Sequence, residues 1–344
     1  MTVDFKTYLS GDNRALTLAS EEGSCSMSRV ESKSGGQGNV EERTVVKTFK
    51  AVTRKEGAGF TIHRPIGDSE MSTATTDPFL MLDELGPVTY GKGEFEGAPW
   101  HPHRGIDTVM YLKEGQGDHQ DSTGNKGSLY AGDCQWMTAG SGIIHDEGRN
   151  HPGGKLHGFQ MWINLPKKHK WIDPAYRTIR SKEKPHYTNK DGSVQANIIA
   201  GTVGDVKAKI QPVVPIQYIE FMLEANASYT HNIPKVANAL KQLEMETCIV
   251  YVYEGEGTFT SKEVKAERTS TLLFSEDGGA VSFTAGDKGL KFMLLAGKKL
   301  KEPVAWHGPF VMNTQEEIME CIRDYQNGKL VRAKPKELLA KSWK

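Results

Sequence analysis

The sequence contains two stretches that decide its fold and its chemistry: WHPHRGIDTVMYLKEG, from Trp100 to Gly115, and TAGSGIIHDE, from Thr138 to Glu147. Each joins apolar residues to a pair of potential metal ligands that are separated by one residue. Side chains two positions apart on a β-strand point to the same face of the sheet. Two such strands facing each other would therefore bring both pairs together in one place.

The two pairs are His101 with His103 and His145 with Glu147. Taken alone, a His-x-His pair is more often an ordinary pair of histidines than a metal site. Together, and beside glycines that leave room for a ligand, the two pairs predict a site with three imidazoles and one carboxylate. Nitrogen and oxygen donors with open positions favour one divalent ion, Fe(II) first, with nickel, manganese, copper or zinc suited to the same donors. Glu147 is also the candidate general base.

Composition narrows the class of protein. The chain has 344 residues, enough for about two domains, and its 43 basic residues equal its 43 acidic ones. This zero net charge argues against direct nucleic-acid binding through general electrostatics. No apolar run is long enough for a membrane span, and no secretory signal is visible. The four cysteines match no paired or metal spacing, so we expect free thiols in a reducing compartment, which is the cytoplasm with the nucleus as a further location. Separately, we expect a monomer.

Short apolar or alternating runs broken by turn residues predict an all-β protein of the sandwich or barrel type. VYVYEGEGTF in the second half parallels VMYLKEGQGDH in the first half, which indicates an internal duplication. We therefore predict a mobile tail at residues 1–45, a first β-domain with the metal site at 46–190, and a second β-domain with terminal helices at 191–344. The Ser- and Gly-rich composition of the tail suits a mobile segment.

A helix is predicted near the C-terminus. Thr314 and Glu317 form a capping box, apolar residues recur at helical spacing, and Gly328 ends the pattern. We expect this helix to pack on the second barrel.

Several motifs resemble the pirin family of double-cupin proteins. They are HPHRG with TVMYLKEG, AGDCQWMTAGSGIIHDE, DPFLMLDELGP, LHGFQMWINLPKKHKW and EPVAWHGPFVMNTQEEI, and the resemblance covers about residues 45–330. It implies two tandem cupin barrels of the jelly-roll type and one metal ion, usually iron, in the first. The family's ligands fall on His101, His103, His145 and Glu147, whereas Asp107 takes the place of a glutamate that is not a ligand. The second barrel offers only His231, so we expect no metal there.

The resemblance implies a metal-dependent dioxygenase that acts on flavonols such as quercetin or on related small enolic molecules, opening the ring with dioxygen. An alternative of another class is an iron-containing, redox-sensitive co-regulator that binds a transcription factor without turnover. Its surface would be a basic patch of Arg104, Lys113 and Lys126, although scattered basic residues are more often a solvated face. A metal-binding protein that catalyses nothing is the third interpretation.

Neighbouring residues have two interpretations each. Trp136, Met137 and Phe159 either line the pocket or, more often for such residues, form core, and Cys134 is expected to be buried. Arg104 either orients a carboxylate or faces solvent. His151 and His157 are expected to be ordinary histidines or to support the ligands rather than to bind the metal.

Overall fold

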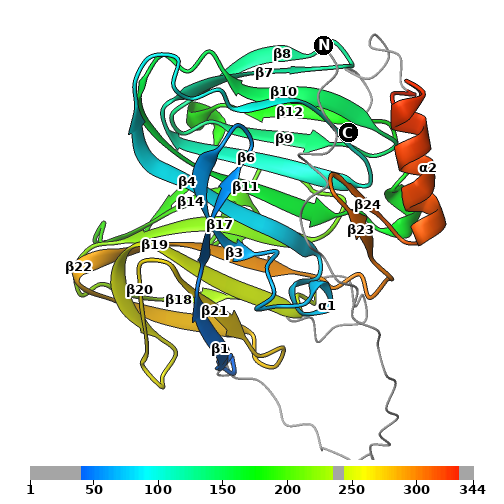
Figure 1. Cartoon of the computed structure of the whole chain (residues 1–344). Helices are drawn as coiled ribbons and strands as arrows, with labels where there is room; N and C mark the ends of the chain where they lie inside the picture. Colours follow the sequence, from blue (N-terminus) through cyan, green and yellow to red (C-terminus); the bar gives the residue numbers. More distant parts are fainter. Residues whose placement is uncertain (1–39, 235–243, 333–344) are drawn as a thin grey trace, which may run out of the picture.

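The computed structural model describes residues 40–234 and 244–332, which form two β-barrels joined side by side (Figure 1). The prediction of an all-β protein with two tandem cupin barrels and a C-terminal helix is confirmed. Residues 1–39, most of the predicted tail, lie outside the described residues. None of the described helices has the length and apolar character needed to cross a bilayer.

The first barrel consists of a seven-stranded and a four-stranded sheet. The larger sheet contains β2 (Val52–Glu56), β3 (Phe60–Ile66), β4 (Phe79–Tyr90), β6 (Ile106–Glu114), β9 (Cys134–Thr138), β11 (Gly154–Asn164) and β12 (Ala175–Ile179). The smaller sheet contains β5 (Ala98–His103), β7 (Gln116–Asp121), β8 (Lys126–Tyr130) and β10 (Ile143–Arg149). Their orders are β12-β9-β6-β11-β4-β3-β2 and β5-β10-β7-β8. Short helical pieces lie between strands: α1 (Thr73–Thr76) between β3 and β4, η1 (Lys167–His169) between β11 and β12, and η2 (Ser181–Glu183) directly after β12.

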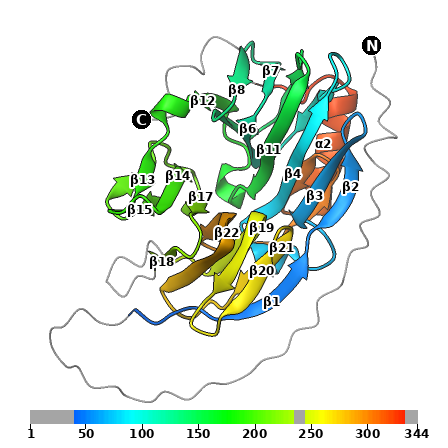
Figure 2. The same cartoon turned by 90° about the vertical axis from the view of Figure 1, so that its left-hand side faces the viewer.

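The second barrel is built around one nine-stranded sheet. Its strands are β1 (Val45–Lys50), β13 (His186–Thr188), β14 (Val194–Ala200), β17 (Ile216–Leu223), β18 (Ser228–Asn232), β19 (Thr247–Phe259), β20 (Val264–Glu267), β21 (Ser270–Phe274) and β22 (Ala280–Gly297). The short pair β15 (Thr202–Val203) and β16 (Val206–Lys207) lies apart. The long strand β22 pairs with β17, β18 and β19. Figure 2 shows β1, which precedes the first barrel in sequence, running beside β20 and β21 of the second.

Strand order reveals the duplication. The first barrel contains the run β9-β6-β11-β4, and the second contains β21-β19-β22-β17 in the same arrangement. The chain passes from the first barrel to the second between β12 and β13. A division into domains at residues 190 and 191 stays a prediction.

The residues just before β1 also attach to the second barrel. Arg43 is fully buried and donates hydrogen bonds to the carbonyl oxygens of Glu246, Ser275 and Gly278, at 2.9, 3.0 and 3.2 Å. A buried guanidinium satisfied in this way anchors the start of the described chain.

Apolar packing joins the two barrels into one body. One core cluster brings Trp136 and Phe159 of the first barrel together with Tyr218 and Tyr251 of the second. All four side chains are almost fully buried. Each large side chain removed from water stabilises the folded state by roughly 1.5–3 kcal/mol, so the barrels hold each other in place.

The predicted C-terminal helix exists, but its expected packing on the second barrel is wrong. It is α2 (Gln315–Gln326), it follows β23 (Ala305–His307) and β24 (Phe310–Met312), and it begins with the predicted capping box. Its buried Ile318 and Cys321 pack in a cluster that includes Ile144 of β10. Figure 1 shows α2 beside the first barrel. The amphipathic pattern reveals that one face is buried but not which barrel buries it.

Candidate metal centre

The four predicted ligands lie on two neighbouring strands of the smaller sheet in the first barrel. His101 and His103 end β5, whereas His145 and Glu147 lie in β10. The strands pair antiparallel, with His145 directly opposite His101. A register shift after His145 then places Glu147 opposite Ala98. The two i, i+2 pairs therefore occupy adjacent strands, and this pairing brings their side chains together.

Three imidazoles converge. The ring centroids of His101 and His145 are 4.3 Å apart, those of His101 and His103 4.9 Å, and those of His103 and His145 5.1 Å. One potential ligand atom from each ring lies within 4.8 Å of the other two. All three residues are buried, with exposures of 5%, 1% and 0% for His101, His103 and His145. This triad could hold a metal ion.

The hydrogen bonds of the triad fit a metal. The Nδ1 atoms of His101 and His103 lie 2.7 and 3.3 Å from the carbonyl oxygens of Pro99 and Pro309. A carbonyl only accepts, so Nδ1 carries the proton and Nε2 keeps its lone pair for a ligand. His145 has both ring nitrogens buried without a hydrogen-bond partner among the described residues. Such burial is costly unless something else satisfies the group, and a divalent ion would do so.

Burial also keeps the triad in its ligating form. Desolvation lowers the pKa of His101 to about 4 and the pKa values of His103 and His145 well below 6.5. Neighbouring imidazoles add to the shift of His103 and His145. The three rings are therefore neutral near pH 7, and a neutral imidazole is the form that binds metals.

Glu147 lies next to the triad rather than within it. Its carboxylate groups with His145 and His119, with one atom from each within 4.8 Å of the others. Its Oε1 accepts a hydrogen bond from Gln160 Nε2 at 3.2 Å. Burial, with a smaller contribution from Asp146, raises the pKa of Glu147 to about 7.

His119 is a neighbour of the site that the sequence analysis did not single out. It lies on β7, its ring centroid is 5.3 Å from that of His145, and it stacks on Tyr176 at 4.6 Å. Its Nδ1 is 2.9 Å from Gln135 Nε2, and its Nε2 is 3.5 Å from Asp121 Oδ2. The signal was present, because His119 and Asp121 form a third i, i+2 pair of potential ligands on a strand that alternates between buried and half-buried residues.

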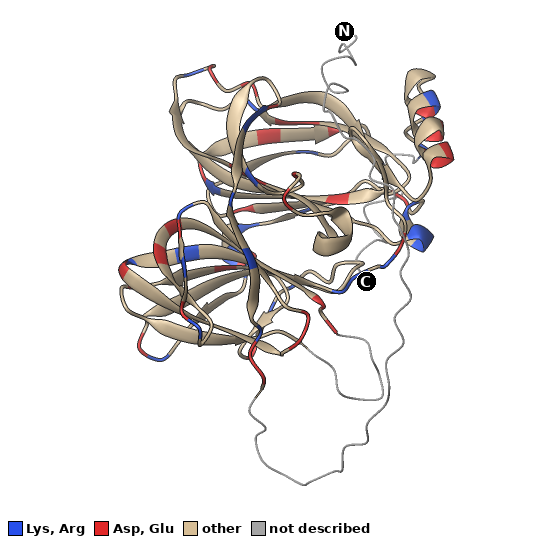
Figure 3. Ribbon diagram, turned by 60° about the horizontal axis from the view of Figure 1, so that its bottom comes forward, with Lys and Arg blue, Asp and Glu red and all other residues tan. Residues whose placement is uncertain are grey.

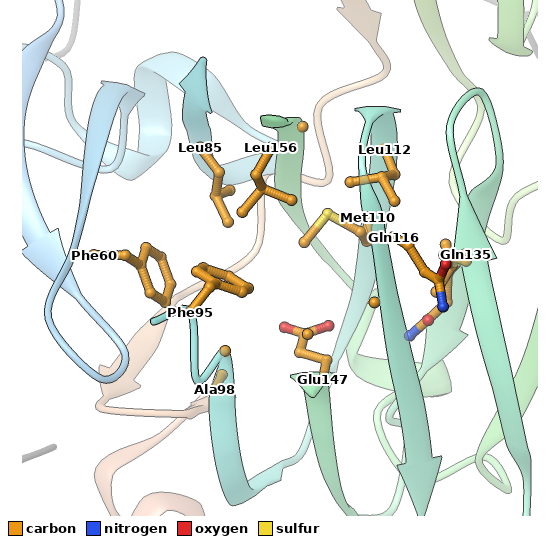
Figure 4. A pocket seen from close by; sticks show the side chains of 15 residues that line it. Phe60, Leu85, Phe95, Ala98, Met110, Leu112, Gln116, Gln135, Glu147 and Leu156 are labelled. Carbon is orange, nitrogen blue, oxygen red and sulfur yellow. The ribbon is translucent and has the colours of Figure 1, made fainter. Parts of the chain in front are cut away.

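A pocket opens beside Glu147 (Figure 4). It contains about 560 Å³ of empty space, part of it open to solvent. Figure 4 shows the Glu147 carboxylate pointing into this space, between a wall of aromatic and aliphatic side chains and a polar end with Gln116 and Gln135. Most of the larger side chains in the lining are apolar: Phe60, Leu85, Phe95, Met110, Leu112, Leu129 and Leu156. A flat, largely apolar molecule with a few polar groups suits such a lining.

The other residues that the sequence analysis named near the site lie outside both the pocket lining and the ligand groups. Trp136, Met137 and Phe159 are fully buried core residues and do not line the pocket, as the commoner interpretation predicted. Asp107 accepts a hydrogen bond from Trp136 Nε1 at 3.0 Å and belongs to neither ligand group. His157 Nε2 is hydrogen-bonded to Glu84 Oε1, at 2.9 Å.

Three further residues from the sequence analysis, His151, Cys134 and His231, are also buried outside both ligand groups. His151 packs on Phe95 and belongs to neither ligand group. Cys134 is buried, as predicted. In the second barrel, the buried His231 bonds Gln217 Oε1 at 2.8 Å. Among the described residues, both groups of potential ligands lie in the first barrel.

The basic patch predicted from Arg104, Lys113 and Lys126 is wrong. Arg104 is fully buried and pairs with Asp324 at 2.9 Å, so of its two interpretations the one that binds a carboxylate is correct. Lys113 pairs with the buried Glu220. Figure 3 shows basic and acidic residues interspersed over both barrels. Long-range pairing of Arg104 and Lys113 with acidic partners explains why their spacing in the sequence was misleading.

Comparison with known families decides the classification. The family model described as Pirin matches residues 59–163, and the model described as Pirin C-terminal cupin domain matches residues 218–331. A pirin-like protein of Solanum lycopersicum is 39% identical over 83% of this chain and 92% of its own length. The chain belongs to the pirin family.

Solved structures of this pirin's relatives agree in fold. Quercetin 2,3-dioxygenase from Acinetobacter baumannii is 30% identical, with a TM-score of 0.77 over 84% of this chain and 98% of that one. The bacterial pirin YhhW from Escherichia coli, solved in complex with nickel(II), is 21% identical, with a TM-score of 0.52 over 74% of this chain and 99% of that one. At that identity the likeness to YhhW concerns the fold alone.

Proposed function

We propose that this pirin is a metal-dependent dioxygenase that opens the ring of flavonols such as quercetin, with a divalent ion held by His101, His103, His145 and Glu147. The observation that carries the proposal is His145, whose two ring nitrogens are buried without partners beside a carboxylate that faces an apolar pocket. The name of the Acinetobacter baumannii relative, a quercetin 2,3-dioxygenase, supports the same reaction.

The ion is proposed to be Fe(II), and nickel, manganese, copper and zinc suit the same imidazole and carboxylate donors. A nickel complex of another pirin is consistent with this range. When bound, any of these ions would supply Lewis acidity, and all of them except zinc would also supply redox capacity. Glu147 would complete the donor set, since its carboxylate oxygen lies within 4.8 Å of a ring nitrogen of His145.

The chain's own residues bind and orient the substrate. Phe60, Phe95 and the leucines of the pocket exclude water and contact the flat rings. Glu147 accepts the proton of the flavonol hydroxyl at a carboxylate oxygen, which makes the ring electron-rich toward dioxygen. Gln135 lines the pocket, and its Oε1 is buried without a partner, so it is placed to accept a hydrogen bond from a ring hydroxyl. Both atoms of dioxygen enter the opened product, and one substrate carbon leaves as carbon monoxide.

The test combines metal analysis with gas exchange on the purified full chain. We expect about one bound ion per chain, and oxygen uptake with quercetin that equals carbon monoxide release. His145→Ala should abolish both metal and uptake, whereas the exposed His186→Asn should leave both unchanged. A chain that holds iron yet consumes no oxygen with flavonols would contradict the dioxygenase and favour a non-catalytic role such as a redox-sensitive regulator.

A further inference from the structure

The C-terminal segment, residues 305–332, lies across the first barrel although it follows the second barrel in the chain (Figure 1). We call it the C-terminal strap. It contains β23, β24 and α2. Phe310 of β24 forms a parallel bridge with Arg104, and Val311 N donates to Arg104 O at 3.2 Å. The strap therefore contacts the backbone directly after His103.

The strap also supplies the hydrogen-bond partner of a proposed metal ligand. His103 Nδ1 donates to the carbonyl oxygen of Pro309, 206 residues away in sequence. This contact sets the tautomer and the ring orientation that leave His103 Nε2 free toward the triad. His101 differs, because its Nδ1 partner is the carbonyl of Pro99, two residues away on the same strand. One ligand is thus oriented locally and the other by the far end of the chain.

An ion-pair network fastens the strap at this point. Arg104 is fully buried, and it donates from Nη2 to Asp324 Oδ2 at 2.9 Å and to Leu330 O at 3.3 Å. Asp324 also accepts from Arg332 at 2.7 Å. The indole of Trp171 lies 4.9 Å from the guanidinium of Arg104 and 4.7 Å from that of Arg332. These contacts connect α2 and the residues after it to the neighbour of His103.

Lys170 makes a second connection between the strap and the residues that follow His103. Its buried ammonium donates to Gly105 O at 2.9 Å, to Val311 O at 2.8 Å and to Asn164 Oδ1 at 2.6 Å. Gly105 has a φ of 84°, and a Cβ there would lie 2.0 Å from Val311 O. The strap therefore approaches so closely that only glycine fits two residues after His103.

We propose that the C-terminal strap is a positioning element of the metal centre, which holds His103 in its ligating orientation and so slows loss of the ion. The proposal rests on the metal site of the proposed function. Partners that orient a ligand typically change metal affinity by about 10- to 100-fold. The strap gives the second half of the chain a role in a site whose ligands all lie in the first half.

The test uses the full chain loaded with zinc alone, a diamagnetic probe. Asp324→Asn removes the ion pair with Arg104, and Lys170→Met removes the connection between Gly105 and Val311. We expect zinc to dissociate into excess chelator about tenfold faster from each variant than from the wild type. Glu320→Gln is the matched control, because Glu320 pairs with Arg332 at 2.9 Å but its carboxylate does not bind Arg104. It should release zinc at the wild-type rate.

A spectroscopic signature separates positioning from general loosening. In protein with nitrogen-15 histidine, the Nδ1 proton of His103 should exchange with water faster in Asp324→Asn, while that of His101 stays unchanged. Equal acceleration of both protons, or unchanged zinc release in both variants, would overturn the proposal. A wild-type chain that binds no zinc would overturn the metal centre itself and the strap's role with it, so the two failures are distinguishable.

Discussion

Tyr111 and Tyr251 occupy equivalent positions in the two barrels, and each donates its hydroxyl proton to a buried glutamate of the opposite barrel. Tyr111 bonds Glu220 Oε2 at 2.6 Å, and Tyr251 bonds Glu84 Oε2 at 2.5 Å. Both glutamates have no exposed surface. The duplicated strands therefore meet across a pseudo-twofold interface, in which each barrel satisfies a buried charge of the other.

This reciprocity predicts matched losses of stability. Tyr111→Phe and Tyr251→Phe should each lower the free energy of unfolding by about 1–3 kcal/mol, because each removes a hydrogen bond to a buried carboxylate. Denaturant unfolding measures the loss, and Tyr130→Phe, at a tyrosine that is 51% exposed, is the control. Stability unchanged in both interface variants would show that the crossed pairs do not hold the barrels together.

His231 of the second barrel predicts a loss of stability in acid. Burial lowers its pKa from 6.5 to about 3, so the unfolded chain binds a proton that the folded chain excludes between these values. The contribution of neutral His231 is complete above pH 6.5 and is lost as the pH falls toward 3. At pH 5 the loss is about 2 kcal/mol, since one pKa unit corresponds to about 1.4 kcal/mol.

The check for His231 is the difference between wild type and His231→Gln in metal-free protein. The buried triad contributes a similar pH dependence to both, so it cancels in the difference. Wild type should lose about 2 kcal/mol more than the variant between pH 7 and pH 5. Parallel pH curves for the two proteins would show that His231 is protonated in the fold or exposed to water.

His119 has a ring nitrogen within 4.8 Å of ligand atoms of His145 and Glu147, but we do not count it among the proposed ligands. His119→Asn should retain about one metal ion per chain, because His119 lies outside the triad of His101, His103 and His145. Metal analysis after dialysis decides this, with His103→Ala as the ligand-deleting comparison. Loss of metal from His119→Asn as complete as from His103→Ala would make His119 a ligand.

Occupying the pocket should block substrate without removing the ion. Ala98 lines the pocket and lies opposite Glu147 on the paired strand. Ala98→Phe places a ring where the flavonol is proposed to bind, so we expect kcat/KM for quercetin to fall at least about tenfold, or about 1.4 kcal/mol, with metal content unchanged. Ala225→Phe, in an exposed turn, should be neutral. Full activity in Ala98→Phe would place the substrate elsewhere.

Much of the site could be predicted from the sequence because its signals are local. A period of two fixes the face on which His101 and His103 point, and the same rule applies to His145 and Glu147. The helix was recognisable from Thr314 and Glu317 for a similar reason, since a capping box spans only four residues.

The rest depends on contacts between distant residues. Arg104 and Asp324 are separated by 220 residues, and Tyr111 and Glu220 by 109. No local pattern indicates such pairs, so Arg104 and Lys113 were assigned to a surface patch and α2 to the wrong barrel. His119 is a different case, because its pairing with Asp121 followed the same spacing as the other candidates.

The most direct test of the central claim is metal content measured together with oxygen uptake in the wild type and His145→Ala. The account predicts about one ion per chain and quercetin-dependent uptake in the wild type, and neither in His145→Ala, with the metal-free variant still folded by circular dichroism. A His145→Ala protein that keeps its ion and its activity would contradict convergence of these ligands on one metal.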